Sequence, residues 1–204
     1  MKLIDAQQKL LSLKVPILET ADAAACLKIS ITHASQILSR LTTSGAFFKL
    51  GKGKWATTQK LDPFMLPEYL VAPFPAYISL QSALYYHGMI SQIPATVYAV
   101  SLARTKQYKT PLGTISLHHL NPGFFFGFDI IPKTQIKIAT PEKALLDFLY
   151  LFPTRTHLFR ALPELEISKK LNIKLMYNWI NKIAFKSRAV LMQKKLDAIL
   201  RGKK

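Results

Sequence analysis

The sequence predicts an α+β protein: an N-terminal winged helix-turn-helix followed by an α+β domain with a basic helical C-terminal tail. Helical and strand-like hydrophobic patterns alternate along its 204 residues. Half of the residues are hydrophobic, which is enough to build a packed core. Two prolines within residues 61–67 predict a linker that divides the chain into domains of residues 1–62 and 63–204.

The first 27 residues predict two short helices. Leucine and alanine at helical spacing indicate a helix over residues 3–13, and Pro16 ends it because proline disfavours helical geometry in the preceding residue. A short extended piece follows at residues 15–18. Thr20 is the expected N-cap of an alanine-rich second helix at residues 21–27.

A third helix is expected over residues 31–44, with Gly45 as the C′ residue that ends it. Two short strands follow at residues 46–50 and 54–57, joined by a tight turn at residues 51–53. The order helix, short turn, helix, glycine, β-hairpin is that of a winged helix-turn-helix.

The third helix has one apolar face and one polar face without any acidic residue. Its polar and preceding turn positions are Ser30, Thr32, His33, Ser35, Gln36, Ser39 and Arg40. Short or hydrogen-bonding side chains of this kind suit a helix that enters the major groove of DNA. N-terminal positions of such a helix usually read bases, which favours Thr32, His33 and Gln36, whereas Arg40 is expected on a phosphate.

The hairpin adds positive charge beside this helix. Lys49, Lys52 and Lys54 are expected over the DNA backbone, where they give salt-dependent affinity with little sequence information. Residues 28–61 contain six Lys and Arg and no Asp or Glu. The pattern therefore predicts double-stranded DNA as the partner, the alternative being a winged helix used only for protein contacts.

The formal charge of +17 is unevenly distributed along the chain. Residues 1–62 contain nine Lys and Arg against four Asp and Glu, and residues 63–150 contain six against four. Residues 151–204 contain thirteen against three. An excess of this size indicates a polyanionic partner.

The basic tail predicts three amphipathic helices, at residues 156–162, 174–184 and 187–200. Its cations on the polar faces are Lys169, Lys170, Lys174, Lys182, Lys186, Arg188, Lys194 and Lys195. Three partners remain open for them: further DNA backbone, RNA, or an acidic protein. A membrane-surface helix is the least favoured use, because a DNA-binding unit precedes it.

The middle of the chain mixes strands and helices. Alternating or β-branched residues predict strands at residues 96–102, 114–120 and 135–139. Ser79 is an expected N-cap of a helix at residues 80–87, and Thr140 followed by Pro141 opens another helix. The phenylalanine-rich run at residues 124–128 predicts buried sheet core or, alternatively, a partner or dimer face.

The segments YISLQSALYYHGM, QIPATVYAVS, TPLGTISLHHLNPGFFFGF and IKIATPEKALLDFLY follow the predicted winged helix. Together with it they resemble the AbiEi-type antitoxin regulators of bacterial abortive-infection, type IV toxin–antitoxin systems, over residues 5–150. The resemblance implies an N-terminal domain that represses its own operon and a C-terminal domain that counteracts a toxin with a nucleotidyltransferase fold. By position it covers residues 32–40, 49–54, 82–88 and 140–147, of which the last two look like determinants of the fold.

No complete set of catalytic residues is recognisable. His118 and His119 are adjacent on a predicted strand and so point to opposite faces. Glu142 and Asp147 lie five apart on one helix, and Asp129 is the nearest other acid. The expectation is therefore no enzyme, no metal and no cofactor. The alternatives are a nuclease-like DNA-processing enzyme, which an acidic cleft at Asp129 and Glu142 would favour, and a stand-alone repressor.

Cys26 is the one cysteine, expected as a small core residue, and it leaves no internal disulfide or cysteine-rich zinc site. The start of the sequence shows no apolar signal-peptide region, which together with the cysteine usage favours a cytoplasmic protein. Residues 69–103 carry no charge, but prolines and Gly88 interrupt them, so no membrane segment is expected. The oligomeric state stays open.

Overall fold

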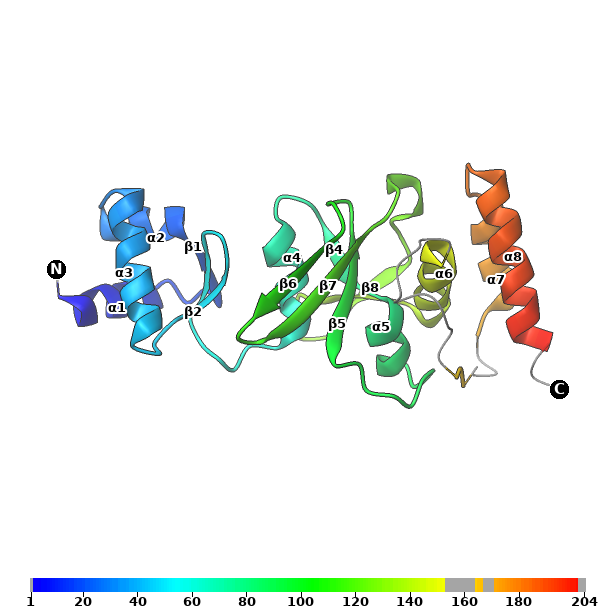
Figure 1. Ribbon diagram of the computed structural model, residues 1–204, viewed down its shortest axis with the longest axis horizontal. Helices are drawn as coiled ribbons and strands as arrows, with labels where there is room; N and C mark the ends of the chain where they lie inside the picture. The colour runs from blue at the N-terminus through cyan, green and yellow to red at the C-terminus, as the bar shows by residue number, and fades with distance from the viewer. Residues whose placement is uncertain (1, 153–163, 167–170, 202–204) are drawn as a thin grey trace.

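The computed structural model describes residues 2–152, 164–166 and 171–201, and the class is mixed α+β as predicted. Three helices and a small sheet form one end of an elongated molecule, a six-stranded sheet forms the middle, and two helices form the other end (Figure 1). The predicted helix at residues 156–162, with Lys169 and Lys170, lies outside the described residues. No helix in the described part of the chain has the length and apolar character needed to cross a membrane.

The N-terminal unit, called the head below, comprises α1 (Leu3–Leu11), β1 (Ile17–Glu19), α2 (Thr20–Leu27), α3 (Ile31–Thr43), β2 (Phe48–Gly51) and β3 (Lys54–Ala56). Its strands are antiparallel in the order β1-β3-β2. Apolar side chains from all three helices and from β1 and β3 form its core, which includes Leu10, Leu18, Leu38, Phe47 and Trp55. Cys26 is partly buried and packs against this core.

The helix ends follow local signals with one correction. Gly45 has a φ of +75° directly after α3, as expected of a C′ glycine. The N-cap of α2 is Glu19, whose backbone N–H donates to the Asp22 side chain at 3.1 Å, so the prediction that Thr20 is the cap was wrong. Thr20 instead accepts a hydrogen bond from Trp55 Nε1 at 2.9 Å, a contact across the head that no local pattern predicts.

The prediction of an irregular linker at residues 61–67 was also wrong. A 3₁₀ turn, η1 (Pro63–Met65), and the short helix α4 (Leu66–Val71) occupy it. Both prolines stand in the first turn of a helical segment, where a missing N–H breaks no hydrogen bond. Leu66 and Leu70 are buried in the same cluster as Ile17 and Leu50 of the head, so this segment packs the head onto the rest of the molecule.

The middle unit contains β4 (Ala76–Ile78), β5 (Thr96–Ser101), β6 (Lys106–Thr110), β7 (Gly113–His119), β8 (Phe128–Ile130) and β9 (Lys137–Ala139). The strand order is β6-β7-β5-β4-β9-β8, with β5–β7 and β4–β9 parallel and the other pairs antiparallel. In β4, Tyr77 lies opposite Val100 and Ile78 opposite Ile138. Strands β5, β7 and β9 match the three predicted strands.

Helices α5 (Leu80–Tyr86) and α6 (Pro141–Leu151) pack against each other beside this sheet, and η2 (Pro122–Phe124) precedes β8. Thr140 caps α6 as predicted, since its hydroxyl accepts from the Lys143 N–H at 3.3 Å. Ser79 occupies the N-cap position of α5, but its side chain makes no capping bond. Residues 143–151 of α6 are all buried, which makes this helix the centre of the middle unit.

The tail helices α7 (Ile173–Asn181) and α8 (Lys186–Arg201) pack on α6 through Met176, Ile180, Met192 and Leu196. Two of the predicted tail cations contact aromatic rings near the end of α6. The Arg188 guanidinium lies 4.4 Å from the centre of the Tyr150 ring, and Lys195 Nζ lies 3.4 Å from that of Phe152. Such cation–π contacts hold part of the tail's charge against the protein.

Candidate functional site

The outward face of α3 gathers the residues predicted for DNA contact. Of its apolar residues, Ala34, Ile37, Leu38 and Leu41 are buried in the head, whereas Ile31 in the first turn is exposed. The polar ones are all exposed: Ser30, Thr32, His33, Ser35, Gln36, Ser39 and Arg40. Helical periodicity places them together on the side away from the core. The face therefore presents hydroxyl, imidazole, amide and guanidinium groups, without a carboxylate.

The start of α3 is fixed by its cap. Ser30 has extended backbone geometry, and its hydroxyl accepts a hydrogen bond from the His33 N–H at 3.2 Å. The other backbone N–H groups of the first turn point out of the helix end, where the helix dipole favours negative charge. Thr32 and His33 lie in this first turn, so the end of α3 with the strongest attraction for an anion also carries exposed polar side chains.

The three hairpin lysines differ in what surrounds them. Lys52 is exposed in the turn between β2 and β3. Lys49 is also exposed, with its Nζ 5.4 Å from the centre of the Trp55 ring. Lys54 forms an ion pair with Glu19 at 2.5 Å, and only 16% of its side chain is exposed. Among the described residues, neither Lys49 nor Lys52 forms an ion pair, whereas Lys54 pairs with Glu19 at the edge of the hairpin.

A buried cluster of polar side chains in the middle unit was missed by sequence reasoning. Lys143 donates to Asp147 one turn along α6, and both side chains are fully buried. The Asp147 carboxylate also accepts from the Ser79 hydroxyl at 2.7 Å and from the Tyr77 hydroxyl at 2.9 Å. This buried cluster of four residues explains why Ser79 does not cap α5.

Aromatic rings close the buried cluster. Lys143 Nζ lies 3.9 Å from the centre of the Phe124 ring and 5.1 Å from that of Phe126. Gly127 has a φ of +72°, and a Cβ there would lie 3.1 Å from Lys143 Cγ, so the stem of Lys143 needs glycine at this position. The phenylalanine-rich run thus lies against the buried cluster, and only Phe128 begins a strand.

Burial shifts the pKa values of the side chains in the buried cluster. It lowers the pKa of Lys143, because an ammonium loses its hydration, although Asp147 opposes the shift. It also raises the pKa of Tyr77, which the neighbouring Asp147 carboxylate raises further. Since Lys143 and Asp147 have no exposed surface, a substrate cannot reach them without rearrangement of the rings, and their present geometry supports the structure of α6.

The acids considered for a nuclease-like site do not meet. Glu142 accepts a hydrogen bond from the Asn172 N–H at 2.9 Å, Asp147 lies in the buried cluster, and Asp129 is exposed on β8. Within the described ranges, no three His, Cys, Asp or Glu side chains come close enough to hold a metal ion. The sequence did contain one signal for the buried ion pair: Lys143 and Asp147 are four residues apart, and residues with this spacing lie on one face of a helix.

His118 and His119 lie on opposite faces of β7, as the sequence predicts. His118 is buried, with its Nε2 3.0 Å from the Ser116 hydroxyl, and His119 on the opposite face is exposed. His87 Nε2 hydrogen-bonds the Ala139 carbonyl at 2.7 Å, which ties the end of α5 to β9. Burial lowers the pKa of His118 to about 4.

Comparison with known proteins adds no relative to this description. No protein-family model matches the chain, and no curated protein matches it either. The structure and the sequence therefore provide the basis for the function proposed next.

Proposed function

We propose that the chain is a DNA-binding transcriptional regulator whose residues 1–62 form a winged helix-turn-helix. The order of elements in the head supports this assignment: three helices, with β1 between the first two and the β2–β3 hairpin after the third. In a winged helix of this order, α3 is the recognition helix and the hairpin is the wing. The protein would act sterically, by occupying an operator and blocking transcription.

One observation carries the proposal: the acid-free outer face of α3 lies in the same small unit as two unpaired hairpin lysines. In the proposed complex, Thr32, His33 and Gln36 reach base edges in the major groove. Arg40, Lys49 and Lys52 contact phosphates and set the orientation of the head. Lys54 contributes less, because Glu19 already neutralises it.

The operator proposed is that of the protein's own operon, and the second partner is a toxin with a nucleotidyltransferase fold. This part follows the resemblance to AbiEi-type antitoxins. Two segments that carry the resemblance meet in the structure, where α5 packs on α6 and His87 bonds Ala139. The tail helices lie at the opposite end of the molecule from α3 (Figure 1). In the proposed complex, their exposed cations contact an acidic toxin while the head binds DNA. We assign no catalytic step.

The test is a gel shift on the DNA upstream of the protein's own operon, with the double variant Gln36→Ala/Arg40→Ala. Loss of the Gln36 base contact alone removes ~1–3 kcal/mol, and loss of the Arg40 phosphate contact weakens binding further, so we expect a decrease of roughly tenfold or more. The matched control is Gln92→Ala/Arg104→Ala, which removes the same two side-chain types from exposed positions outside the head. An unchanged shift for the α3 variant at moderate salt would remove α3 as the recognition helix.

A further inference from the structure

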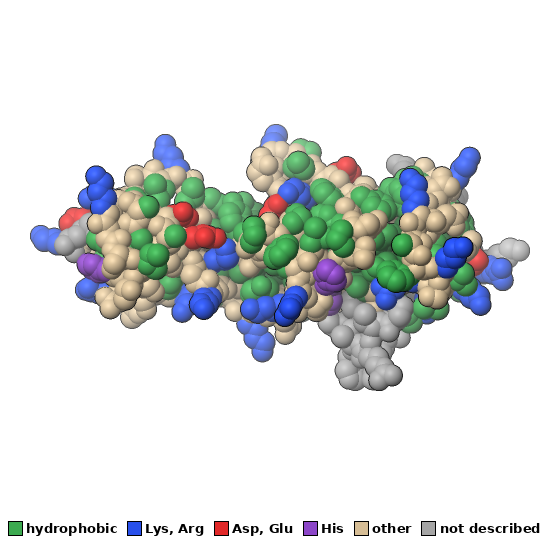
Figure 2. Space-filling model, turned by 90° about the horizontal axis from the view of Figure 1, so that it is seen from above, with side chains coloured by type: hydrophobic (Ala, Val, Ile, Leu, Met, Phe, Trp, Pro, Cys, Tyr) green, Lys and Arg blue, Asp and Glu red, His purple; other side chains and the backbone are tan. Residues whose placement is uncertain are grey.

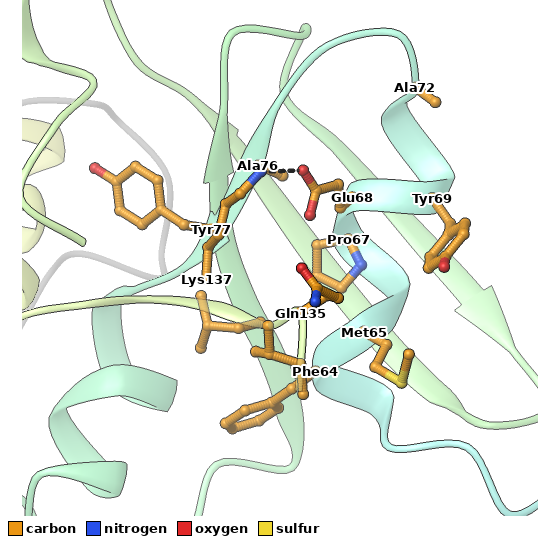
Figure 3. A pocket seen from close by; sticks show the side chains of 12 residues that line it. Phe64, Met65, Pro67, Glu68, Tyr69, Ala72, Ala76, Tyr77, Gln135 and Lys137 are labelled. Carbon is orange, nitrogen blue, oxygen red and sulfur yellow. Dashed lines mark hydrogen bonds and ion pairs between the residues drawn. The ribbon is translucent and has the colours of Figure 1, made fainter. Parts of the chain in front are cut away.

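An apolar pocket of about 310 Å³ lies between the η1–α4 segment and the β4–β9 part of the sheet. Phe64, Met65 and Tyr69 line it from the helical side, and Ala76 and Lys137 line it from the sheet side (Figure 3). This volume is at the lower end of the range for small-molecule sites, which are mostly apolar with a few polar groups. The aromatic side chains of Phe64 and Tyr69 in so small a space favour a flat apolar molecule.

The pocket has polar groups but no uncompensated charge among its described lining residues. Glu68 and Lys137, which both line it, form an ion pair with each other, drawn as the dashed line in Figure 3. Gln135 adds a neutral amide that can donate or accept a hydrogen bond. A charged ligand would lose hydration here without gaining a free counter-ion, so the lining selects an uncharged ligand.

Tyr77 is part of the pocket wall on β4, and its side chain extends from the strand away from the other labelled lining residues (Figure 3). Figure 3 shows the hydroxyl pointing away from the pocket, and it donates to Asp147 in the buried cluster at 2.9 Å. The ring also stacks on Phe128, with centroids 4.8 Å apart. The contacts with Asp147 and Phe128 therefore fix Tyr77, and this wall of the pocket is rigid before any ligand binds.

The other wall is the segment that joins the head to the middle unit. Pro67 and Glu68 of α4 line the pocket, while Leu66 and Leu70 pack in the cluster that contains Ile17 and Leu50 of the head. A Cβ on Gly51 of the hairpin would lie 3.8 Å from a Leu70 methyl group. A ligand that shifts α4 would therefore also shift the β2–β3 hairpin, because Leu70 of α4 contacts it.

We propose that this pocket binds a small, uncharged aromatic molecule and that α4 transmits its binding to the head. The proposal of a binding site depends only on the geometry of the pocket. The regulatory consequence, a change in DNA affinity on binding, rests on the proposed function. Differential affinity of the ligand for two positions of α4 is what such coupling requires.

The experiment titrates the protein with N-phenyl-1-naphthylamine, a neutral dye whose fluorescence rises in apolar surroundings and which the charge of +17 does not attract. We expect saturable one-to-one binding. Ala76→Leu and Ala72→Phe each fill the pocket and weaken dye binding by roughly tenfold or more. Ala72 is exposed at the rim, so its variant keeps the test valid if the buried Ala76→Leu variant fails to fold. Ala198→Leu adds the same atoms on the surface of α8 as a control.

Dye binding that is absent, or equally strong in the pocket-filling variants, overturns the site. The second readout is the gel shift with and without dye, in which we expect at least a threefold change in DNA affinity that Ala72→Phe abolishes. A dye that binds in the pocket and leaves DNA affinity unchanged overturns the coupling through α4. Loss of any DNA shift in the untreated protein counts against the proposed function, while the fluorescence titration still decides the site.

Discussion

The head and the middle unit use charge in opposite ways. In the head, Arg40 of α3 and the hairpin residues Lys49 and Lys52 are exposed, and the Lys54–Glu19 ion pair is partly exposed. In the middle unit, Lys143 and Asp147 are sealed under aromatic rings with no exposed surface. Figure 2 shows Lys and Arg side chains projecting from both ends of the molecule. Charge therefore lies on the surface at the ends, where the proposed partners would bind, and a buried pair fixes the packing of α6 between them.

The largest effect is expected from breaking the buried ion pair. Asp147→Ala leaves the Lys143 ammonium buried without its counter-ion and leaves the Tyr77 and Ser79 hydroxyls without their acceptor. We expect a loss of ~3–5 kcal/mol in the free energy of unfolding, measured by urea denaturation. The double variant Lys143→Met/Asp147→Asn removes both charges and keeps an acceptor oxygen, so it is expected to recover more than half of that loss.

The matched variant in the head is Lys54→Gln, which breaks the ion pair with Glu19. An exposed pair of this kind is worth ~1 kcal/mol or less, because water and salt screen it. If Asp147→Ala and Lys54→Gln lowered the free energy of unfolding equally, the contrast between the buried ion pair of the middle unit and the partly exposed ion pair of the head would be wrong.

A smaller effect follows from the buried His118, whose pKa burial lowers to about 4. Below its unfolded pKa of about 6.5, the unfolded chain binds a proton that the folded protein does not, so stability falls as pH decreases. The loss runs from pH ~6.5 down to ~4 and amounts to about 2 kcal/mol between pH 7 and pH 5. Urea denaturation at these two pH values measures it.

His118→Gln removes this contribution, so the variant should lose less stability between pH 7 and pH 5 than the wild type does. Its stability at pH 7 is not the readout, because the substitution also changes packing against Tyr98. His33→Gln makes the same change on the exposed face of α3 and is expected to keep the wild-type pH profile. A wild-type profile for His118→Gln would show that His118 does not control this dependence.

The sequence predicts the elements of the head well because its signals are local. Helical spacing of Ala34, Ile37 and Leu38 defines the buried face of α3, and Gly45 ends the helix through a positive φ. Because the apolar residues define the buried face of α3, the remaining polar residues are predicted to be exposed, as the structure shows. In the middle unit, β-branched residues likewise predict β5 and β7, and Thr140 predicts the start of α6.

The features that were missed depend on contacts between distant residues. Strand β6 is polar and mostly exposed, and it forms because β7 pairs with it at the edge of the sheet. The segment at residues 63–71 is helical because both prolines fall in the first turn of a helical segment and because Leu66 and Leu70 are buried between two units. Asp147 joins residues 68 and 70 positions away in the chain, Ser79 and Tyr77, so only the spacing from Lys143 was visible in the sequence.

The smallest effect is expected from the exposed lysines, and it compares the two ends of the molecule. Lys49→Gln/Lys52→Gln removes two proposed phosphate contacts of the hairpin and should reduce the slope of log affinity for DNA against log salt by about 2. Lys174→Gln/Lys194→Gln removes the same charge from exposed positions of α7 and α8. It should leave the slope unchanged but weaken capture of the protein encoded by the adjacent gene, the proposed toxin.

Both variants are measured in the same two assays, a salt titration of DNA binding and a pull-down with the adjacent gene's product. Each double variant removes two positive charges. A difference between the two variants in either assay is therefore due to the position of the lysines and not to the total charge. A reduced salt slope for the α7–α8 variant would mean that the tail contacts DNA as well, and unchanged capture would remove the tail as the toxin's docking surface. If instead the hairpin variant alone keeps the wild-type slope, the hairpin does not lie on the DNA backbone, and the outward charge of the head serves another partner.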